Sequence, residues 1–394
     1  MINRHDASWR PLLLALALFF AAAPAFAADK PTPPVDQQRV DAAIGKGKDW
    51  LLARLKEGLP DMGNWGWINS EQTFHEVVLY ALLSAGVPNT DPDLVKAVLD
   101  CRQKEVCTTY GAALRAQAFH KFDAGKLSAD LTNCAQFLID NQDKDGYWGY
   151  GEKQTLPAVP PVTFTQAAGA VASGPAGGVV KKAAASNTTA LRNKIVLTRK
   201  GWGKKNDNSN TQYAMLGFAA TMTAGIYPPA DVFQLVDKWL SDCQNEDGGW
   251  GYAERGTPMH GGEASYGSMT AGAVSSLSIA LRFHKNQDPM KDIRVQKGVA
   301  WLGKNLTFDT NPAKGGWQYY WIYSVERAGS FAGTQWFGDR PWYYEGATYL
   351  LDKQEGDGSW GPGDAREKIL NTCWGILFLK QASRNYVYSL DHRK

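Results

Sequence analysis

The sequence predicts an all-α fold in which six inner and six outer helices form a single ring, an (α/α)6 toroid. The first observation behind this prediction is a motif, Gln-x-x-Asp-Gly-x-Trp-Gly, that occurs three times. The second is that amphipathic segments precede the motif, whereas segments that are apolar on nearly every face follow it. A repeat of about 50 residues is typical of stacked supersecondary units.

The repeated motif suits a junction between two helices. Glycine accepts the left-handed conformation that ends a helix, so the Asp-Gly pair fits the turn, and the tryptophan covers it. We therefore expect the motif to build the ring rather than to take part in catalysis. Its residues are Gln142, Asp145 and Trp148, then Gln244, Asp247 and Trp250, then Gln354, Asp357 and Trp360.

Hydrophobic periodicity gives the expected helices. Before the second full motif, Val232, Val236 and Leu240 follow helical spacing along one face, which indicates an outer helix. Segments that are apolar all round indicate buried inner helices. Outer helices are predicted near 36–57, 92–103, 128–142, 230–244, 292–305 and 342–354. Inner helices are predicted near 71–86, 108–122, 208–224, 265–284, 318–331 and 366–382.

The first 27 residues have the pattern of a cleaved signal peptide. Arg4 and Arg10 precede an apolar run that is short for a membrane span and closes in Ala25-Phe26-Ala27. We therefore expect a secreted or periplasmic protein without a transmembrane anchor after cleavage. The predicted organisation is a signal peptide at 1–27, a linker at 28–35 and a toroid domain at 36–394.

A stretch at about 151–200 interrupts the repeat. It carries prolines and many small residues but no sustained apolar stripe. Its Pro157-to-Pro161 segment favours an extended, exposed start. We expect a low-complexity insertion, and a protein partner could bind through it.

Charge and cysteine content exclude several classes of partner. The net charge is +3, with acidic and basic residues interleaved, which argues against a nucleic-acid-binding surface. Five cysteines are an odd number, and only Cys101 and Cys107 lie close in sequence. A disulfide between these two is one interpretation, and buried free thiols are favoured.

The repeat resembles the Gln-Trp motif of squalene-hopene and oxidosqualene cyclases, and the twelve predicted helices resemble the single toroid of protein prenyltransferase β subunits. The resemblance implies the squalene-cyclase and prenyltransferase fold over nearly the whole chain after residue 35. It implies no single activity, because such toroids include cyclases, prenyltransferases and thioester-domain proteins.

The family's chemical motifs are incomplete in this sequence. Squalene-hopene cyclases carry Asp-x-Asp-Asp-Thr where this chain has Asp207-Asn-Ser-Asn-Thr211, so their proton donor aligns with Ser209. A hydroxyl group is too weak an acid to protonate an alkene. The prenyltransferase zinc pair aligns with Asn371 and Cys373, and a neutral amide is a poor zinc ligand. The thioester sequence lacks its cysteine at Gly261-Gly262-Glu263. We therefore expect no metal and no cofactor.

Function is expected at the rim where the inner helices begin. Weak catalytic candidates there are Asp207, His260, Glu263 and Tyr266, because they combine carboxylate, imidazole and phenol groups. The aligned helix N-termini favour an anionic head group on a ligand. Glu326 and Arg327 are expected to pair within the helix packing. The expected ligand-binding residues are Asn208, Tyr213, Trp317, Tyr319, Tyr320 and Tyr323.

Three hypotheses remain open at this point. The first is a toroid that binds an apolar or isoprenoid-type ligand in its centre without protonation chemistry. The second is an extracytoplasmic lyase or hydrolase that acts on a sugar ligand, since aromatic rims suit carbohydrates. The third is a protein-interaction toroid that resembles thioester domains.

Overall fold

Twelve α-helices and one short 3-10 helix make up the regular structure of the described residues. The computed structural model describes residues 30–60, 71–164, 207–253, 264–384 and 386–387. All of these helices lie in the unit Thr32–Lys394. The predicted signal peptide lies outside the described residues. None of the described helices is long and apolar enough to span a membrane.

The predicted all-α class is confirmed, and the helix bounds agree with the predicted ones to within three residues. The odd-numbered helices are α1 (Gln37–Glu57), α3 (Pro92–Gln103), α5 (Ser128–Asp140), α7 (Ala230–Cys243), α9 (Ile293–Asn305) and α11 (Trp342–Lys353). The even-numbered helices are α2 (Glu71–Ser84), α4 (Thr109–Asp123), α6 (Asn208–Thr223), α8 (Gly267–Lys285), α10 (Gln318–Ala332) and α12 (Ala365–Leu379). The 3-10 helix η1 (Pro289–Lys291) was not predicted.

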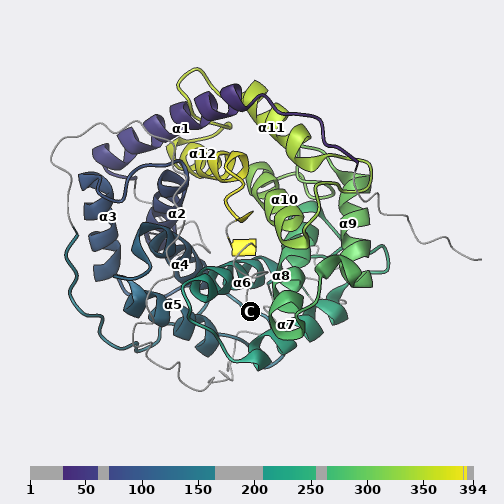
Figure 1. The fold of residues 1–394 in the computed structure, drawn as a ribbon, viewed down its shortest axis with the longest axis horizontal. Helices are drawn as coiled ribbons and strands as arrows, with labels where there is room; N and C mark the ends of the chain where they lie inside the picture. Colours follow the sequence, from purple (N-terminus) through teal and green to yellow (C-terminus); the bar gives the residue numbers. More distant parts are fainter. Residues whose placement is uncertain (1–29, 61–70, 165–206, 254–263, 385, 388–394) are drawn as a thin grey trace, which may run out of the picture. The chain divides into compact units, whose positions relative to one another are not determined.

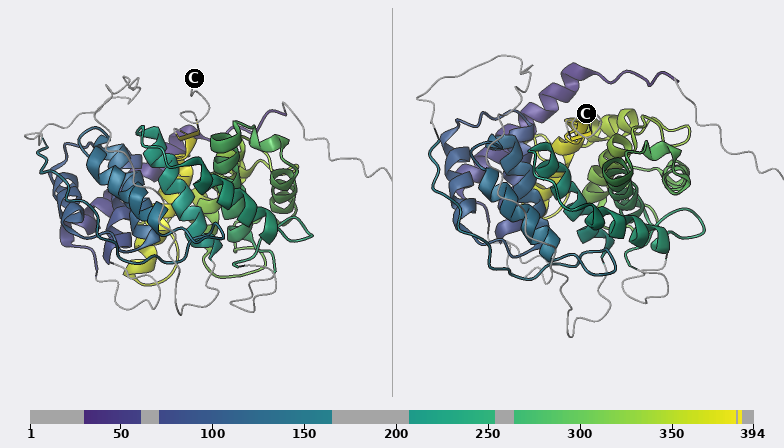
Figure 2. Two further views of the ribbon diagram at one scale, coloured as in Figure 1. Left: turned by 90° about the horizontal axis from the view of Figure 1, so that it is seen from below. Right: turned by 60° about the horizontal axis from the view of Figure 1, so that its bottom comes forward.

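Within this unit the even-numbered helices pack against one another in a closed cycle. Each one contacts the next even-numbered helix, and α12 contacts α2 again. The odd-numbered helices lie outside them in Figure 1, and Figure 2 shows both sets from the side. The two sets also differ in burial: nearly every residue of α6 is buried, whereas α7 buries one face. The helices that are apolar all round are therefore the inner ones.

The glutamines of the motif tie each helix pair to the following outer helix. The side-chain Nε2 of each glutamine donates to a carbonyl in its own turn and to a carbonyl of an outer helix. Gln142 donates to Val232 in α7 at 2.9 Å, and Gln244 donates to Arg294 in α9 at 2.9 Å. Gln354 donates to Ala43 in α1 at 2.8 Å. The last bond links the end of the chain's repeat series to its beginning.

The motif tryptophans stabilise the same helix junctions. Trp148, Trp250 and Trp360 are fully buried. In each of them the indole Nε1 donates to a carbonyl ten residues earlier, at the end of the preceding outer helix, over 2.7–2.8 Å. Burial of a large aromatic surface together with a satisfied indole N–H makes these side chains strong stabilisers.

The motif aspartates are less uniform than the sequence suggests. Asp247 accepts from the indole of Trp301 at 2.9 Å, and Asp357 accepts from the indole of Trp50 at 3.2 Å. In the first motif, Trp239 takes the corresponding position on α7 but donates to Asn208 at 2.9 Å instead of to Asp145. The first junction therefore draws on the start of α6, next to the candidate site.

Gly248 gives a direct test of the junction. Its φ is +90°, and an added Cβ would lie 2.9 Å from the carbonyl oxygen of Lys297. We expect Gly248→Ala to lower the free energy of unfolding by more than the roughly 1–2 kcal/mol that a left-handed alanine costs. The matched control is Gly45→Ala in α1, where nothing lies within 4 Å of the new Cβ. That change should stabilise by about 0.5–1 kcal/mol. Urea denaturation measures both, and equal effects would contradict this account.

The described start of the predicted insertion is extended and lies along the outside of the helices. Carbonyls of Pro157, Pro160 and Thr163 accept from Asn133, Arg102 and Lys126 at 2.8, 2.7 and 3.3 Å. Residues 165–200 of the insertion lie outside the described residues, so a partner bound there stays a prediction.

The five cysteines form no disulfide. Four of them are buried, and Cys107 is partly exposed. Burial raises the pKa of Cys134 to about 12, so this thiol stays protonated. Cys373 is fully buried in α12. In the described part of the chain, no group of three His, Cys, Asp or Glu side chains is placed to hold a metal ion.

Candidate functional site

Asp207 organises the start of α6. It is the N-cap of the helix, and its Oδ1 accepts from the backbone N–H groups of Ser209 at 2.8 Å and Asn210 at 3.2 Å. Its Oδ2 accepts from the Asn210 side-chain amide at 2.7 Å. A capping carboxylate of this kind satisfies helix donors that would otherwise be left without partners.

Ser209 forms hydrogen bonds with two partners. Its hydroxyl donates to Asp207 Oδ1 at 2.5 Å and accepts from the Tyr110 hydroxyl at 2.6 Å. The serine proton is therefore directed at the carboxylate of Asp207, the N-cap of the same helix.

A second pair of phenols reaches the other oxygen of the same carboxylate. The Tyr252 hydroxyl donates to Asp207 Oδ2 at 2.5 Å, and the Tyr150 hydroxyl lies 3.1 Å from that of Tyr252. We call Asp207, Ser209, Asn210, Tyr110, Tyr150 and Tyr252 the Asp207 cluster. Since Tyr252 donates to the aspartate, the shared proton of the two phenols comes from Tyr150.

The phenols of the Asp207 cluster stay protonated. Burial raises the pKa values of Tyr110, Tyr150 and Tyr252, and the negative charge of Asp207 raises each of them further. Tyr252 is therefore a hydrogen-bond donor to Asp207, Tyr110 to Ser209 and Tyr150 to Tyr252. All three phenols are poor general bases near neutral pH.

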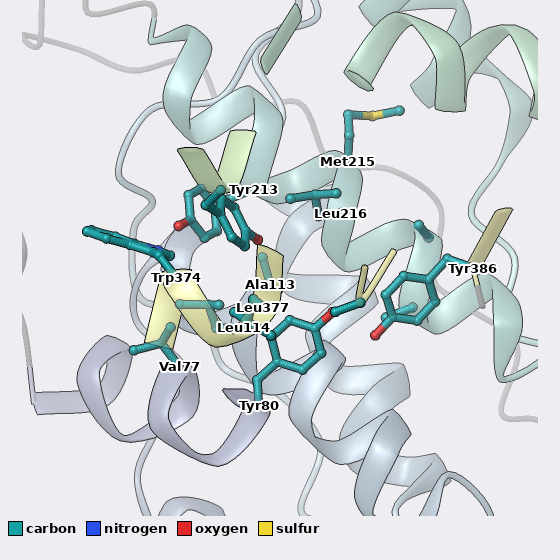
Figure 3. Close-up of a cluster of buried hydrophobic side chains, with 14 of the residues drawn as sticks. Val77, Tyr80, Ala113, Leu114, Tyr213, Met215, Leu216, Trp374, Leu377 and Tyr386 are labelled. Carbon is teal, nitrogen blue, oxygen red and sulfur yellow. The ribbon is translucent and has the colours of Figure 1, made fainter. Parts of the chain in front are cut away.

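An aromatic cluster lies next to the Asp207 cluster and consists of Tyr213, Tyr320, Tyr323 and Trp374, from α6, α10 and α12. Tyr213 stacks on Tyr320 and Tyr323 with ring centroids 6.2 and 6.1 Å apart, and Tyr110 lies 4.3 Å from it on another side. Trp374 lies 5.8 Å from Tyr320. Figure 3 shows Tyr213 and Trp374 beside each other, with Tyr80 and Leu377 nearby. Tyr320 is fixed by a 2.6 Å hydrogen bond to Gln212 Oε1.

Deeper in the unit, α10 carries a fully buried ion pair. Arg327 Nη1 contacts Glu326 Oε2, and the guanidinium carbon lies 3.7 Å from the centroid of the Tyr323 ring. Glu326 Oε1 accepts from Ser330 at 2.8 Å and from the backbone N–H of Ser383 at 3.3 Å. The predicted pairing of Glu326 with Arg327 is thus present, with a cation–π contact added to it.

The structure brings only some of the predicted site residues together. Tyr213, Tyr320 and Tyr323 meet in the aromatic cluster. Burial raises the pKa of Tyr266, and the negative charge of Asp207 raises it further. His260 and Glu263 lie outside the described residues. Their part in the site therefore stays a prediction.

Three predicted ligand-binding residues lie elsewhere. Asn208 is almost fully buried and bonds outward, to the Gly251 carbonyl at 2.8 Å and to Trp239 at 2.9 Å. Tyr319 packs against Gly361 of the third motif, because adjacent residues on a helix point about 100° apart. Trp317 is 39% exposed and has a left-handed φ of +61°. Such a conformation is rare for a bulky residue and marks this position as strained.

The expected anionic head group does not fit the starts of α4, α6, α8 and α12. The N-termini of α4, α6 and α12 are capped by Thr108, Asp207 and Asp364, and the Ser268 N–H in α8 is taken by Asn311. These side chains occupy the positions that an anion would need, and Asp207 and Asp364 add negative charge. At the starts of α2 and α10 the anionic head group stays a prediction, since α10 has no side-chain cap and the residues before α2 lie outside the described part of the chain.

Tyr150 and Tyr252 were missed by the sequence reasoning, although a signal was present. Each follows a motif tryptophan by two residues, in Trp148-Gly-Tyr150 and Trp250-Gly-Tyr252. The third motif has Pro362 at this position, which hides the pattern. An extended motif, Trp-Gly-Tyr, would have pointed to the pair.

His120, in the last turn of α4, makes stability depend on pH. Burial lowers its pKa from 6.5 to about 4. The folded protein therefore keeps His120 neutral while the unfolded chain takes up a proton, so stability falls as the pH drops from about 6.5 to about 4. We expect this residue to account for about 3 kcal/mol of that loss. His120→Gln should remove this part of the slope in urea denaturation at pH 7, 5.5 and 4. An unchanged slope would contradict the assignment.

The comparisons with protein families and with curated proteins give no match. No family model matches this sequence, and no curated protein matches it either. The case for a function therefore rests on the residues and on their geometry.

Proposed function

We propose that residues 36–394 form a single (α/α)6 toroid of the squalene-cyclase and prenyltransferase type, in a secreted or periplasmic protein that binds an apolar or isoprenoid-type ligand. Support for the fold comes from the closed cycle of inner-helix contacts and from the glutamine bond between the third motif and α1. Support for the location comes from the pattern of residues 1–27.

The single observation that carries the ligand class is the state of the Asp207 cluster. Its one carboxylate accepts five hydrogen bonds, from Ser209, Asn210 and Tyr252, so its oxygens are occupied by donors of the protein itself. Ser209 donates to that carboxylate instead of towards the aromatic cluster. The geometry therefore supports binding without protonation chemistry.

The hydrogen-bond direction also defines the polar end of the ligand. Because Tyr110 donates to Ser209 and Tyr150 donates to Tyr252, lone pairs on these two phenol oxygens can accept from a ligand, and a hydroxyl group provides the matching donor. The rings of the aromatic cluster offer apolar faces to a polyene chain. A neutral isoprenoid alcohol provides both a hydroxyl donor and an apolar chain. The negative charge of a diphosphate would instead be repelled by Asp207.

Thermal unfolding in the presence of geranylgeraniol tests the proposal. We expect a rise of a few degrees at saturating ligand, because a ligand at 100 times its dissociation constant stabilises by about 2.7 kcal/mol. Geranylgeranyl diphosphate should give a smaller rise. Tyr213→Leu should abolish the geranylgeraniol effect, and the control Tyr227→Leu, at a 49% exposed surface ring, should keep it.

Two product assays separate the alternatives. Incubation with squalene should yield no cyclised product, because Ser209 occupies the position that aligns with the proton donor of the cyclases. A carbohydrate-active enzyme needs two carboxylates about 5–10 Å apart, and the Asp207 cluster contains one. Release of reducing ends from a glycan panel, together with no effect of geranylgeraniol, would overturn the proposal in favour of that enzyme.

A further inference from the structure

A polar pocket lies at the opposite ends of the inner helices from the Asp207 cluster. Its volume is about 310 Å³, and it is formed where α2, α4 and α12 end and α1 begins. The side chains that matter here are Lys121, Lys380, Arg384, Asp41, Ser84 and Gln381, all of which line it.

The pocket collects positive charge that the protein does not neutralise with ion pairs. Lys121, Lys380 and Arg384 line it, and none of the three forms an ion pair with any described carboxylate. The one carboxylate in the lining, Asp41, accepts instead from the Gln37 amide at 2.9 Å. Three cations thus face a single anion.

Helix ends do not account for all of this charge. The C-termini of α2, α4 and α12 each carry about −0.5 charge, and the N-terminus of α1 carries about +0.5. Set against three cations and Asp41, these partial charges leave the pocket positive by about one charge. A singly charged anion would balance it.

Two further groups in the lining lack partners. Ser84 is 5% exposed, and its hydroxyl has no hydrogen-bond partner among the described residues. The side-chain oxygen of Gln381 likewise has none there, and Gln381 has a left-handed φ of +45°. A buried polar group without a partner is costly, and strained backbone is concentrated at functional sites.

The pKa of Lys121 is affected by its neighbours in the pocket. Burial lowers its pKa, and the neighbouring positive charge of Lys380 lowers it further. A bound anion would offset both effects, because an opposite charge within a few ångströms favours the protonated amine.

We propose that this pocket binds the phosphate or carboxylate group of a small anion, held by Lys121, Lys380 and Arg384 and by the hydroxyl of Ser84. Ser84 donates its otherwise unused proton, and Asp41 limits the affinity by repulsion. The pocket is separate from the aromatic cluster, so the inference does not depend on the proposed isoprenoid ligand.

Isothermal titration calorimetry of the full-length protein at pH 7 and constant low ionic strength tests this, with inorganic phosphate and acetate as separate probes. We expect saturable binding at one site per protein, and the tighter probe identifies the group. Lys121→Gln should weaken binding about tenfold, which is about 1.4 kcal/mol. Lys304→Gln, the removal of an exposed charge in the last turn of α9, should leave it unchanged.

Asp41→Asn is a second variant that tests the proposal if Lys121→Gln folds poorly. Removal of the opposing carboxylate should tighten binding of the better probe several-fold. The proposal is overturned if neither probe saturates, if Asp41→Asn weakens binding, or if Lys304→Gln weakens it as much as Lys121→Gln does.

Discussion

Replacement of Arg327 with methionine is expected to lower the free energy of unfolding by about 3–5 kcal/mol, the cost of leaving a buried charge without its partner. Glu326 and Arg327 are both fully buried, and Glu326 keeps only the Ser330 hydroxyl and the Ser383 N–H as donors once the guanidinium is gone. The cation–π contact with Tyr323 is lost in the same change. Urea denaturation at pH 7 measures the effect.

The double variant Glu326→Gln/Arg327→Met separates lost pairing from lost packing. A neutral amide of similar shape removes the uncompensated charge, so the double variant should recover most of the stability that the single change loses. Methionine fills much of the arginine volume and adapts to irregular space. If the double variant were as unstable as Arg327→Met alone, packing around the guanidinium would be the main contribution, and the account of the ion pair would be wrong.

Replacement of Trp250 with alanine is the second change with a large expected effect. The side chain is fully buried between α8 and α9, and its indole N–H bonds to the Leu240 carbonyl at 2.8 Å. Truncation of a buried Trp costs about 3–5 kcal/mol, since both transfer energy and cavity formation contribute. The same junction would also lose a hydrogen bond to a buried carbonyl.

Trp317→Ala is the matched control for that experiment, because Trp317 is 39% exposed. Its removal should change the free energy of unfolding by less than about 1 kcal/mol. Alanine keeps most of the backbone strain of the left-handed φ, because it also has a Cβ. Similar losses for Trp250→Ala and Trp317→Ala would show that the motif tryptophans have no special structural role.

Most of the helical architecture could be predicted from sequence because each helix type carries its own periodicity. The all-round apolar character of α6 and the one-sided stripe of α7 distinguish inner from outer helices without any tertiary information. The 3-10 helix at Pro289–Lys291 was missed because three residues are too short for a periodic signal.

The site was predicted less well because its contacts join residues far apart in sequence. Tyr110 and Ser209 meet across 99 positions, and Tyr252 reaches Asp207 across 45. Periodicity places a residue on a helix but does not give the direction of its side chain. Hence two neighbours, both predicted to bind a ligand, lie apart: Tyr320 joins the aromatic cluster, whereas Tyr319 points to another helix junction.

The central claim is that the protein holds a neutral isoprenoid-type ligand beside the Asp207 cluster. Organic extraction of protein purified from its own host, followed by mass spectrometry, tests it most directly. The account predicts one neutral, hydroxyl-bearing polyprenyl lipid at close to one molecule per protein, and its absence from a Tyr213→Leu variant purified in the same way. Recovery of no lipid from the unmodified protein, or of equal lipid from both proteins, would contradict it.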